Sequence, residues 1–333
     1  MDKSKITLSL DWLLEPQNPG VRYLALRDLV RLQPDDQQLI EAKKNAYEQG
    51  HIATILDHMH EEGYWVEPGP GYRPKYRSTV WALILLAQLG ASLEEDERID
   101  IACQYLLEHT YAQGGYFTHS GTPSGTFDCL QGNLCWALSK LGCQDPRLTE
   151  AYHWMARSVT GEGIAQKSEK KAPIRYYAYQ CGPGFECGSN YALPCAWGAT
   201  KIMLAFSQLP SNKRSALVKR AIEIGMDFFF SVEPTSATWP FHERINSAWW
   251  KFGFPVFYIT DLLQVAEALA FLGYAKDPRL ASLIQLIFDK ADEKGRWDLE
   301  YHYNKKTWGT YGEKGKPNKW VTLRASRVLH TWF

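Results

Sequence analysis

Two short motifs recur along the chain at intervals of about fifty residues, and this repetition limits the possible folds more than any other feature. The first motif begins a helix with an Asp, followed two residues later by an Arg, and it occurs at Asp96, Asp145 and Asp277. Asp caps the free N–H groups of a helix start, and the proline after Asp145 and Asp277 fits the first turn. The motif therefore marks the starts of three related helices.

The second motif ends these helices with a glycine and an aromatic residue, in EEGYW (61–65), QGGYF (113–117) and EKGRW (293–297). Glycine ends a helix because it readily adopts a left-handed backbone conformation. The aromatic side chain is then expected to fold back onto the packed helices. Together the two motifs describe a helical unit that is repeated around one hydrophobic core.

Apolar and amphipathic segments alternate between these motifs. The segments that are apolar on most of their circumference are predicted to be inner helices: 20–32, 78–90, 127–142, 188–209, 257–273 and 319–333. The amphipathic segments are predicted to be outer helices: 37–61, with a break near Gly50, 95–110, 147–158, 213–230 and 277–293. Residues 5–14 are the sixth outer candidate, packed beside the C-terminal helix.

Six such pairs predict an all-α fold, an α6/α6 toroid in which an outer layer of six helices surrounds six inner helices. We expect residues 1–333 to form a single α/α toroid domain. An open helical solenoid is the alternative, because it repeats at a similar period. Closure is favoured because the inner helices are too apolar to face a wet concave groove.

Three long connections, 64–77, 160–186 and 231–256, are rich in Gly, Pro and aromatic residues. Each runs from the end of an outer helix to the start of the next inner helix, so all three should gather at one end of the ring. Long loops on one face of a regular scaffold are where binding sites usually form. We expect a site there, at the mouth of a central cavity.

Polar and aromatic residues in the first turns of the inner helices would meet at this mouth. Asp128 and Asp261 are the candidate catalytic acids, because a partly desolvated carboxyl group has a raised pKa and can protonate an alkene or an ether oxygen. Each could instead simply cap its helix. The candidate substrate-binding residues are Tyr76, Trp81, Gln131, Asn133, Asn190, Trp197, Phe257, Tyr258 and Trp320.

The cysteines permit a metal site near the same helix starts. Asp128, Cys129, Cys181 and Cys187 have the ligand types of a zinc site, and His242 is a further candidate ligand. Two alternatives remain open. The cysteines can be small apolar core residues, or one of them can be a nucleophile whose pKa is lowered by a helix N-terminus.

Composition argues against several classes of partner. Lys plus Arg and Asp plus Glu both number 37, and this zero net charge argues against a nucleic-acid binder. No apolar run approaches the roughly 20 residues that span a bilayer, although contact with a membrane surface is compatible with the sequence. The N-terminus lacks the features of a signal peptide, so a cytoplasmic location is expected.

The glycine–aromatic motifs resemble the repeats of the prenyltransferase and squalene-cyclase superfamily. Whole stretches look like its uncharacterised bacterial single-toroid branch: NPGVRYLALRDL (18–29), CLQGNLCWALSKLG (129–142) and FPVFYITDLLQVAEALAFLG (254–273). The resemblance implies an α6/α6 barrel with an aromatic cavity that holds isoprenoid chains. Some members of the family bind zinc through an Asp, a Cys and a His, whereas others use a D-x-D-D motif as the proton donor. Here Asp128 stands directly before Cys129. It is also the single acidic residue of the segment FDC, so the D-x-D-D motif is absent.

The leading hypothesis is a terpene cyclase-like or prenyltransferase-like protein that acts on an isoprenoid, with zinc as the candidate cofactor. Trp81, Trp197, Tyr258 and Trp320 would form aromatic walls that stabilise a carbocation. A carbohydrate-active toroid enzyme, a glycosidase or lyase, is the alternative, and it needs two facing carboxylates about 5 to 10 Å apart. A non-catalytic scaffold that binds a peptide or protein on the mouth loops is the third.

Overall fold

The computed structural model describes residues 8–240 and 246–333, and within these ranges the chain is predominantly helical, as an all-α fold requires. The only paired strands in the described ranges form two short antiparallel hairpins, β1 (Tyr111–Ala112) with β2 (Tyr116–Phe117) and β3 (Glu186–Cys187) with β4 (Leu193–Pro194). In the same ranges no helix combines the length and apolar character needed to span a membrane.

The helices form two sets. The inner set consists of α3 (Pro19–Ala25), extended by the π-helical turn Leu26–Val30, α6 (Thr79–Leu89), α8 (Asp128–Leu141), α10 (Ala196–Phe206), α12 (Leu262–Leu269), extended by the π-helical turn Ala270–Tyr274, and α14 (Lys319–Trp332). The outer set consists of α2 (Leu10–Leu13), α4 (Gln37–Glu48), α5 (His51–Leu56), α7 (Glu97–Thr110), α9 (Pro146–Thr160), α11 (Ala216–Phe229) and α13 (Ala281–Asp289).

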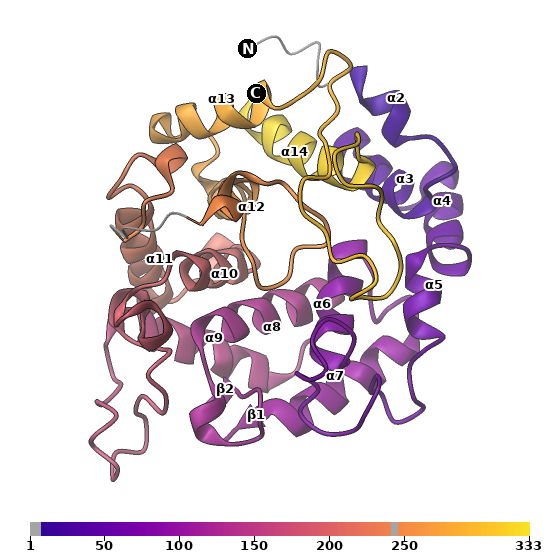
Figure 1. Ribbon diagram of the computed structural model, residues 1–333. Helices are drawn as coiled ribbons and strands as arrows, with labels where there is room; N and C mark the ends of the chain where they lie inside the picture. The colour runs from indigo at the N-terminus through magenta and orange to yellow at the C-terminus, as the bar shows by residue number, and fades with distance from the viewer. Residues whose placement is uncertain (1–7, 241–245) are drawn as a thin grey trace.

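The inner helices contact one another in chain order, α3 with α6, then α8, α10, α12 and α14, and α14 contacts α3 in turn. Figure 1 shows the outer helices on the periphery of this arrangement. Helix α2 packs against α14, so the N-terminal and C-terminal helices lie side by side. All described residues of α6 except Gln88 are buried, whereas α11 buries one stripe of residues at helical spacing.

The repeated motifs have the structural roles expected from the sequence. The side chains of Asp96, Asp145 and Asp277 each accept a hydrogen bond from the backbone N–H two residues later. The indole N–H groups of Trp65 and Trp297 each donate, at 2.7 Å, to the carbonyl oxygen of the residue ten positions earlier. The aromatic residue thus ties the end of one helix to the connection that follows it.

The backbone of each motif is also fixed to the next inner helix. The N–H of Trp65 donates to Thr79 Oγ1 at 3.2 Å, and that of Trp297 donates to Thr322 Oγ1 at 3.0 Å. At the corresponding place the N–H of Phe117 donates to Gln131 Oε1 at 2.9 Å. One side chain near the start of each of these inner helices therefore holds the incoming loop.

Two inner helices start later than the sequence pattern suggests. Residues 186–195 form the β3–β4 hairpin, with Tyr191 and Ala192 at φ of 58° and 59°, so helix α10 begins at Ala196 and not at 188. The second, α12, begins at Leu262 and not at 257, and Asp261 is its N-cap. In both places the backbone finds hydrogen-bond partners outside the helix; for example, the Cys195 N–H donates to the Phe185 carbonyl at 2.8 Å.

Candidate functional site

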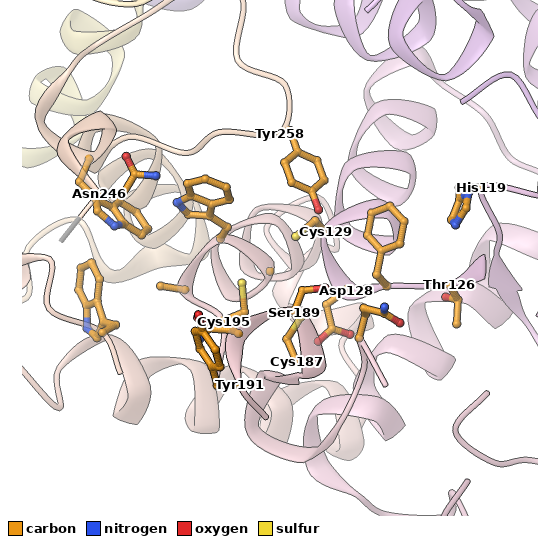
Figure 2. Close-up of a pocket in the computed structure, with 18 of the residues that line it drawn as sticks. His119, Thr126, Asp128, Cys129, Cys187, Ser189, Tyr191, Cys195, Asn246 and Tyr258 are labelled. Carbon is orange, nitrogen blue, oxygen red and sulfur yellow. The ribbon is translucent and has the colours of Figure 1, made fainter. Parts of the chain in front are cut away.

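A cavity of about 610 Å³ lies at the N-terminal ends of α8 and α10 (Figure 2). Its walls come from these two helix starts, the β3–β4 hairpin and the connections that contain Tyr72, His119, Trp239 and Tyr258. All three long loops that the sequence places at a common mouth contribute to the wall, through Tyr72, Gln180 and Trp239. The aromatic wall residues are Tyr72, Phe127, Tyr191, Trp197, Trp239, Trp249 and Tyr258.

Six of the residues predicted from the sequence line this cavity, although they come from segments far apart in the chain. They are Asp128, Cys129, Cys187, Asn190, Trp197 and Tyr258. The other predicted residues are not part of its wall: Tyr76, Trp81, Gln131, Asn133, Cys181, Phe257, Asp261 and Trp320. His242, the further candidate ligand, lies outside the described residues.

Asp128 is the first residue of α8 and is almost fully buried, with 2% of its surface exposed. It does not cap the helix, because the N-cap is Phe127 and no side-chain cap is formed there. Ser158 Oγ donates to Asp128 Oδ1 at a long 3.5 Å. Asp128 Oδ2 has no hydrogen-bond partner among the described residues, so one carboxyl oxygen in the cavity wall is left without a donor.

Burial raises the pKa of Asp128 well above its ordinary value, and the nearby Cys187 acts in the same direction. Hydrogen bonds from Cys181 and Ser158 only partly oppose this effect. The protonated form of this carboxyl group is thus favoured over the charged form. Gly198 on α10 makes room for it, because a Cβ at this position would lie 3.1 Å from Asp128 Cβ.

Asp261, the second candidate acid, has a different environment. Its carboxylate accepts hydrogen bonds from the backbone N–H of Gln264 at 2.7 Å and of Gly253 at 3.2 Å. Arg324 donates two more, at 2.9 and 3.0 Å. Asp261 thus caps α12 and pairs with a buried arginine. Capping is the alternative to acid catalysis that the sequence left open for this residue.

Three predicted aromatic residues outside the wall form a cluster next to Tyr72. Tyr76, Trp81 and Phe257 pack together, with ring centroids 5.0 to 5.6 Å apart. The indole N–H of Trp81 donates to the Tyr72 carbonyl at 2.8 Å and so positions a residue that does line the cavity. Trp320 stacks on Phe254 with centroids 4.6 Å apart.

Two buried amides also have structural partners. Gln131 donates to the Phe117 carbonyl at 2.6 Å and accepts from the Phe117 N–H. Asn133 donates to the Phe257 carbonyl at 3.4 Å. These side chains hold loops against the inner helices, and neither belongs to the cavity wall.

Several wall residues were not identified from the sequence, among them Tyr72, Phe127, Trp239 and Trp249. Two exposed cations, Arg73 and Lys75, also belong to the wall. The Lys75 ammonium group lies 5.4 Å from the ring centre of Tyr72 and 5.1 Å from that of Tyr258. The many aromatic residues in loops 64–77 and 231–256 indicated that these loops contribute to the site. The sequence did not show which of their side chains would face the cavity.

Zinc binding at this site depends on the thiols next to Asp128. The Cys195 thiol is within hydrogen-bonding reach of both Cys129 and Cys187. The Cys181 thiol is within hydrogen-bonding reach of the Asp128 carboxyl group. The hydrogen bond with Cys129 and burial raise the pKa of Cys195 to about 12, although the hydrogen bond with Cys187 acts in the opposite direction. Within ranges 8–240 and 246–333, no group of three or more His, Cys, Asp and Glu side chains could hold a metal ion. Zinc binding by Asp128, Cys129, Cys181 and Cys187 therefore stays a prediction.

No protein-family model and no curated protein matches the chain. Among solved structures, the chain is similar to a type II terpene cyclase, MstE from Scytonema, at 13% identity and a TM-score of 0.32, covering 84% of this chain and 95% of that chain. A variant of that cyclase in complex with its substrate geranylgeranyl dihydroxybenzoate has 13% identity, a TM-score of 0.33 and coverages of 84% and 94%. A protein from Actinoplanes has 12% identity, a TM-score of 0.32 and coverages of 85% and 97%.

Proposed function

We propose that residues 1–333 form one α6/α6 toroid that acts as a terpene cyclase-like enzyme. Its aromatic cavity binds a long apolar isoprenoid, and Asp128 protonates an alkene of that substrate. The observation that carries the proposal is a buried carboxyl group with one unpartnered oxygen in the wall of an aromatic cavity. Isolated buried carboxyl groups are costly and occur mainly where chemistry requires them.

The size and lining of the cavity suit such a substrate. A volume of about 610 Å³ lies within the range of small-molecule sites. Trp197, Trp239, Trp249 and Tyr258 supply aromatic faces, which attract a cation by about 0.5 to 2 kcal/mol each. Arg73 and Lys75 lie at the exposed edge, where they suit an anionic or polar end of the substrate.

In the proposed first step, the π electrons of a substrate alkene take the proton from the Asp128 carboxyl group. A C–H bond forms and the O–H bond breaks, which leaves a carboxylate beside a carbocation. The two opposite charges attract each other strongly because Asp128 is almost fully buried. A second alkene of the substrate then attacks the carbocation and closes a ring, which moves the positive charge to another carbon. Loss of a proton from a neighbouring carbon to water gives the neutral product, and a proton from solvent returns Asp128 to its neutral form.

The carbohydrate-active alternative depends on a pair of carboxylates. Asp128 is the one carboxylate among the described residues that line the cavity, and Asp261 is bound to Arg324 outside its wall. The pair on which that hypothesis depends is therefore not assembled in this cavity, and no observation favours it over acid catalysis on an alkene.

Substrate binding is expected to quench tryptophan fluorescence and to stabilise the protein, because three tryptophans line the cavity. With a panel of C10 to C30 prenyl alcohols and diphosphates, a ligand at about a hundred times its Kd should add about 2.7 kcal/mol to the free energy of unfolding. Replacing Trp197 by Phe should reduce the quenching, whereas Trp12→Phe, on α2 and outside the cavity wall, should not. Absence of both signals with every chain length would contradict the proposal.

The proposed reaction contains no step through zinc, and elemental analysis checks this directly. Protein purified without a metal-affinity tag is expected to contain well below one zinc per chain and to keep its activity in EDTA. One tightly bound zinc per chain, lost together with activity on chelation, would instead make Cys129, Cys187 and Cys195 ligands and would favour a prenyltransferase-like reaction.

A further inference from the structure

A second cavity, of about 510 Å³, lies near the C-terminal ends of the inner helices, away from the helix starts that contain Asp128. Its wall includes residues of the π-helical turn after α3 and of α6, α8 and α14. We propose that this cavity is a binding site for a small organic oxyanion, a phosphate ester or a carboxylate. The proposal does not depend on the reaction assigned to the first cavity.

The charges in the wall are unbalanced. Arg27 Nε donates to Asp28 Oδ1 at 2.6 Å, and Arg327 pairs with the other oxygen of the same carboxylate. Two guanidinium groups thus share one Asp. Arg31 and Lys140 also line the cavity, and neither has an ion pair or hydrogen bond among the described side chains. Counted together, four basic side chains face one carboxylate, a surplus of three positive charges.

The deeper part of the wall does not compensate for this surplus. Arg324 is bound to Glu267 and to Asp261, and the buried Lys201 donates to Gln264 beside them. Burial lowers the pKa of Lys201, which lies behind the wall, to about 7, so these four groups add no positive charge of their own. The excess charge therefore remains in the outer part of the cavity.

Lys140 shows that the surplus has an energetic cost. It stands in the last turn of α8, where burial and the charges of Arg27 and Arg327 lower its pKa to about 8. Only Asp28 acts in the opposite direction. Cations commonly occupy helix C-termini because they offset the helix dipole, but that role does not account for a lysine that is repelled by two arginines in the wall of one cavity. A bound oxyanion would supply the missing negative charge.

The wall also indicates what kind of anion fits. Guanidinium groups bind phosphate and carboxylate oxygens in a bidentate manner. Trp136, Val256 and Phe271 supply apolar surface next to the cations. A ligand with an oxyanion at one end and a ring or short carbon chain at the other would use both parts.

Calorimetric titration with phenyl phosphate, benzoate and pyrophosphate tests the proposal. Phenyl phosphate and benzoate share one ring and differ in the oxyanion, so their relative affinities identify the preferred head group. Saturable 1:1 binding of at least one probe is expected, weakened about tenfold or more by Lys140→Met. Lys219→Met, an exposed position on α11, is the matched control and should bind as the wild type does.

A second readout covers the case in which Lys140→Met fails to fold. Lysine acetylation of the wild-type protein at pH 7, followed by mass spectrometry, should label Lys140 faster than Lys219, and a saturating probe should slow the labelling of Lys140 several-fold without affecting Lys219. Binding should persist in Asp128→Asn. No binding of any probe, or equal weakening by Lys140→Met and Lys219→Met, would overturn the proposal.

Discussion

Replacing Asp128 by Asn should lower the rate of product formation from an isoprenoid substrate by about a thousandfold, the usual range for loss of a positioned general acid. Asparagine has nearly the same shape but no transferable proton. Because the aromatic walls remain intact, quenching of tryptophan fluorescence by the substrate should change little. Initial rates measured by mass spectrometry, together with the fluorescence titration, separate loss of chemistry from loss of binding.

Asp145→Asn is the matched control for this experiment. Asp145 caps α9 through the backbone N–H of Arg147 and does not line the cavity. Asn is also a good cap, so this variant should keep wild-type activity. If Asp128→Asn kept more than about a tenth of the wild-type rate, Asp128 could not be the proton donor.

The same substitution has a consequence for the pH dependence of stability. Because the pKa of Asp128 is raised in the folded protein, the folded state holds a proton that the unfolded chain releases above its ordinary pKa of 3.8. The stabilising contribution of this carboxyl is therefore fully present below that value and is lost as pH rises toward the folded pKa. Relative to wild type, Asp128→Asn should become progressively more stable as the pH rises above about 4, as measured by denaturant unfolding.

Replacing Arg324 by Met should reduce the free energy of unfolding by about 3 to 5 kcal/mol. The guanidinium group is 6% exposed and binds Asp261 and Glu267, which are 5% and 11% exposed, and it also donates to the Gly253 carbonyl at 2.7 Å. Its removal leaves two buried carboxylates without their cation. Because Arg324 belongs to α14 and its partners lie on or next to α12, the substitution weakens the contact between these two inner helices.

Arg279→Met provides the comparison for an exposed ion pair. Arg279 pairs with Asp277 at 2.7 Å, but its side chain is 52% exposed. Such pairs contribute about 1 kcal/mol or less, so this variant should unfold at nearly the same urea concentration as the wild type. Similar midpoints for the Arg324 and Arg279 variants would mean that the α12–α14 ion cluster does not hold the inner helices together.

The local parts of this structure were predictable from sequence because their causes are local. Asp96, Asp145 and Asp277 cap helices through atoms two residues away, and the glycines at 63, 115 and 295 have positive φ values. The break of the first outer helix near Gly50 was also predicted, because its cause, a glycine at that position, is local. The prediction that Asp128, Cys187 and Trp197 approach one cavity followed from the order of inner and outer helices.

The errors arose where a distant partner determines the outcome. Asp261 looked like a candidate acid because its partner, Arg324, is 63 residues away in sequence. The start of α10 was placed too early because the hairpin before it depends on left-handed Tyr191 and Ala192, which are residue types that rarely signal a turn. The second cavity was not predicted, since Arg27, Lys140 and Arg327 each resemble an ordinary cation near a helix end.

Mass analysis of products formed in D₂O tests the central role of Asp128 most directly. The carboxyl proton exchanges with solvent, so protonation of an alkene by Asp128 should place one deuterium on carbon at the start of each turnover. We expect wild-type protein, incubated with the prenyl panel, to yield a cyclised product carrying one solvent-derived deuterium, and Asp128→Asn to yield almost none. A product without deuterium, or equal yields from the two proteins, would contradict the account.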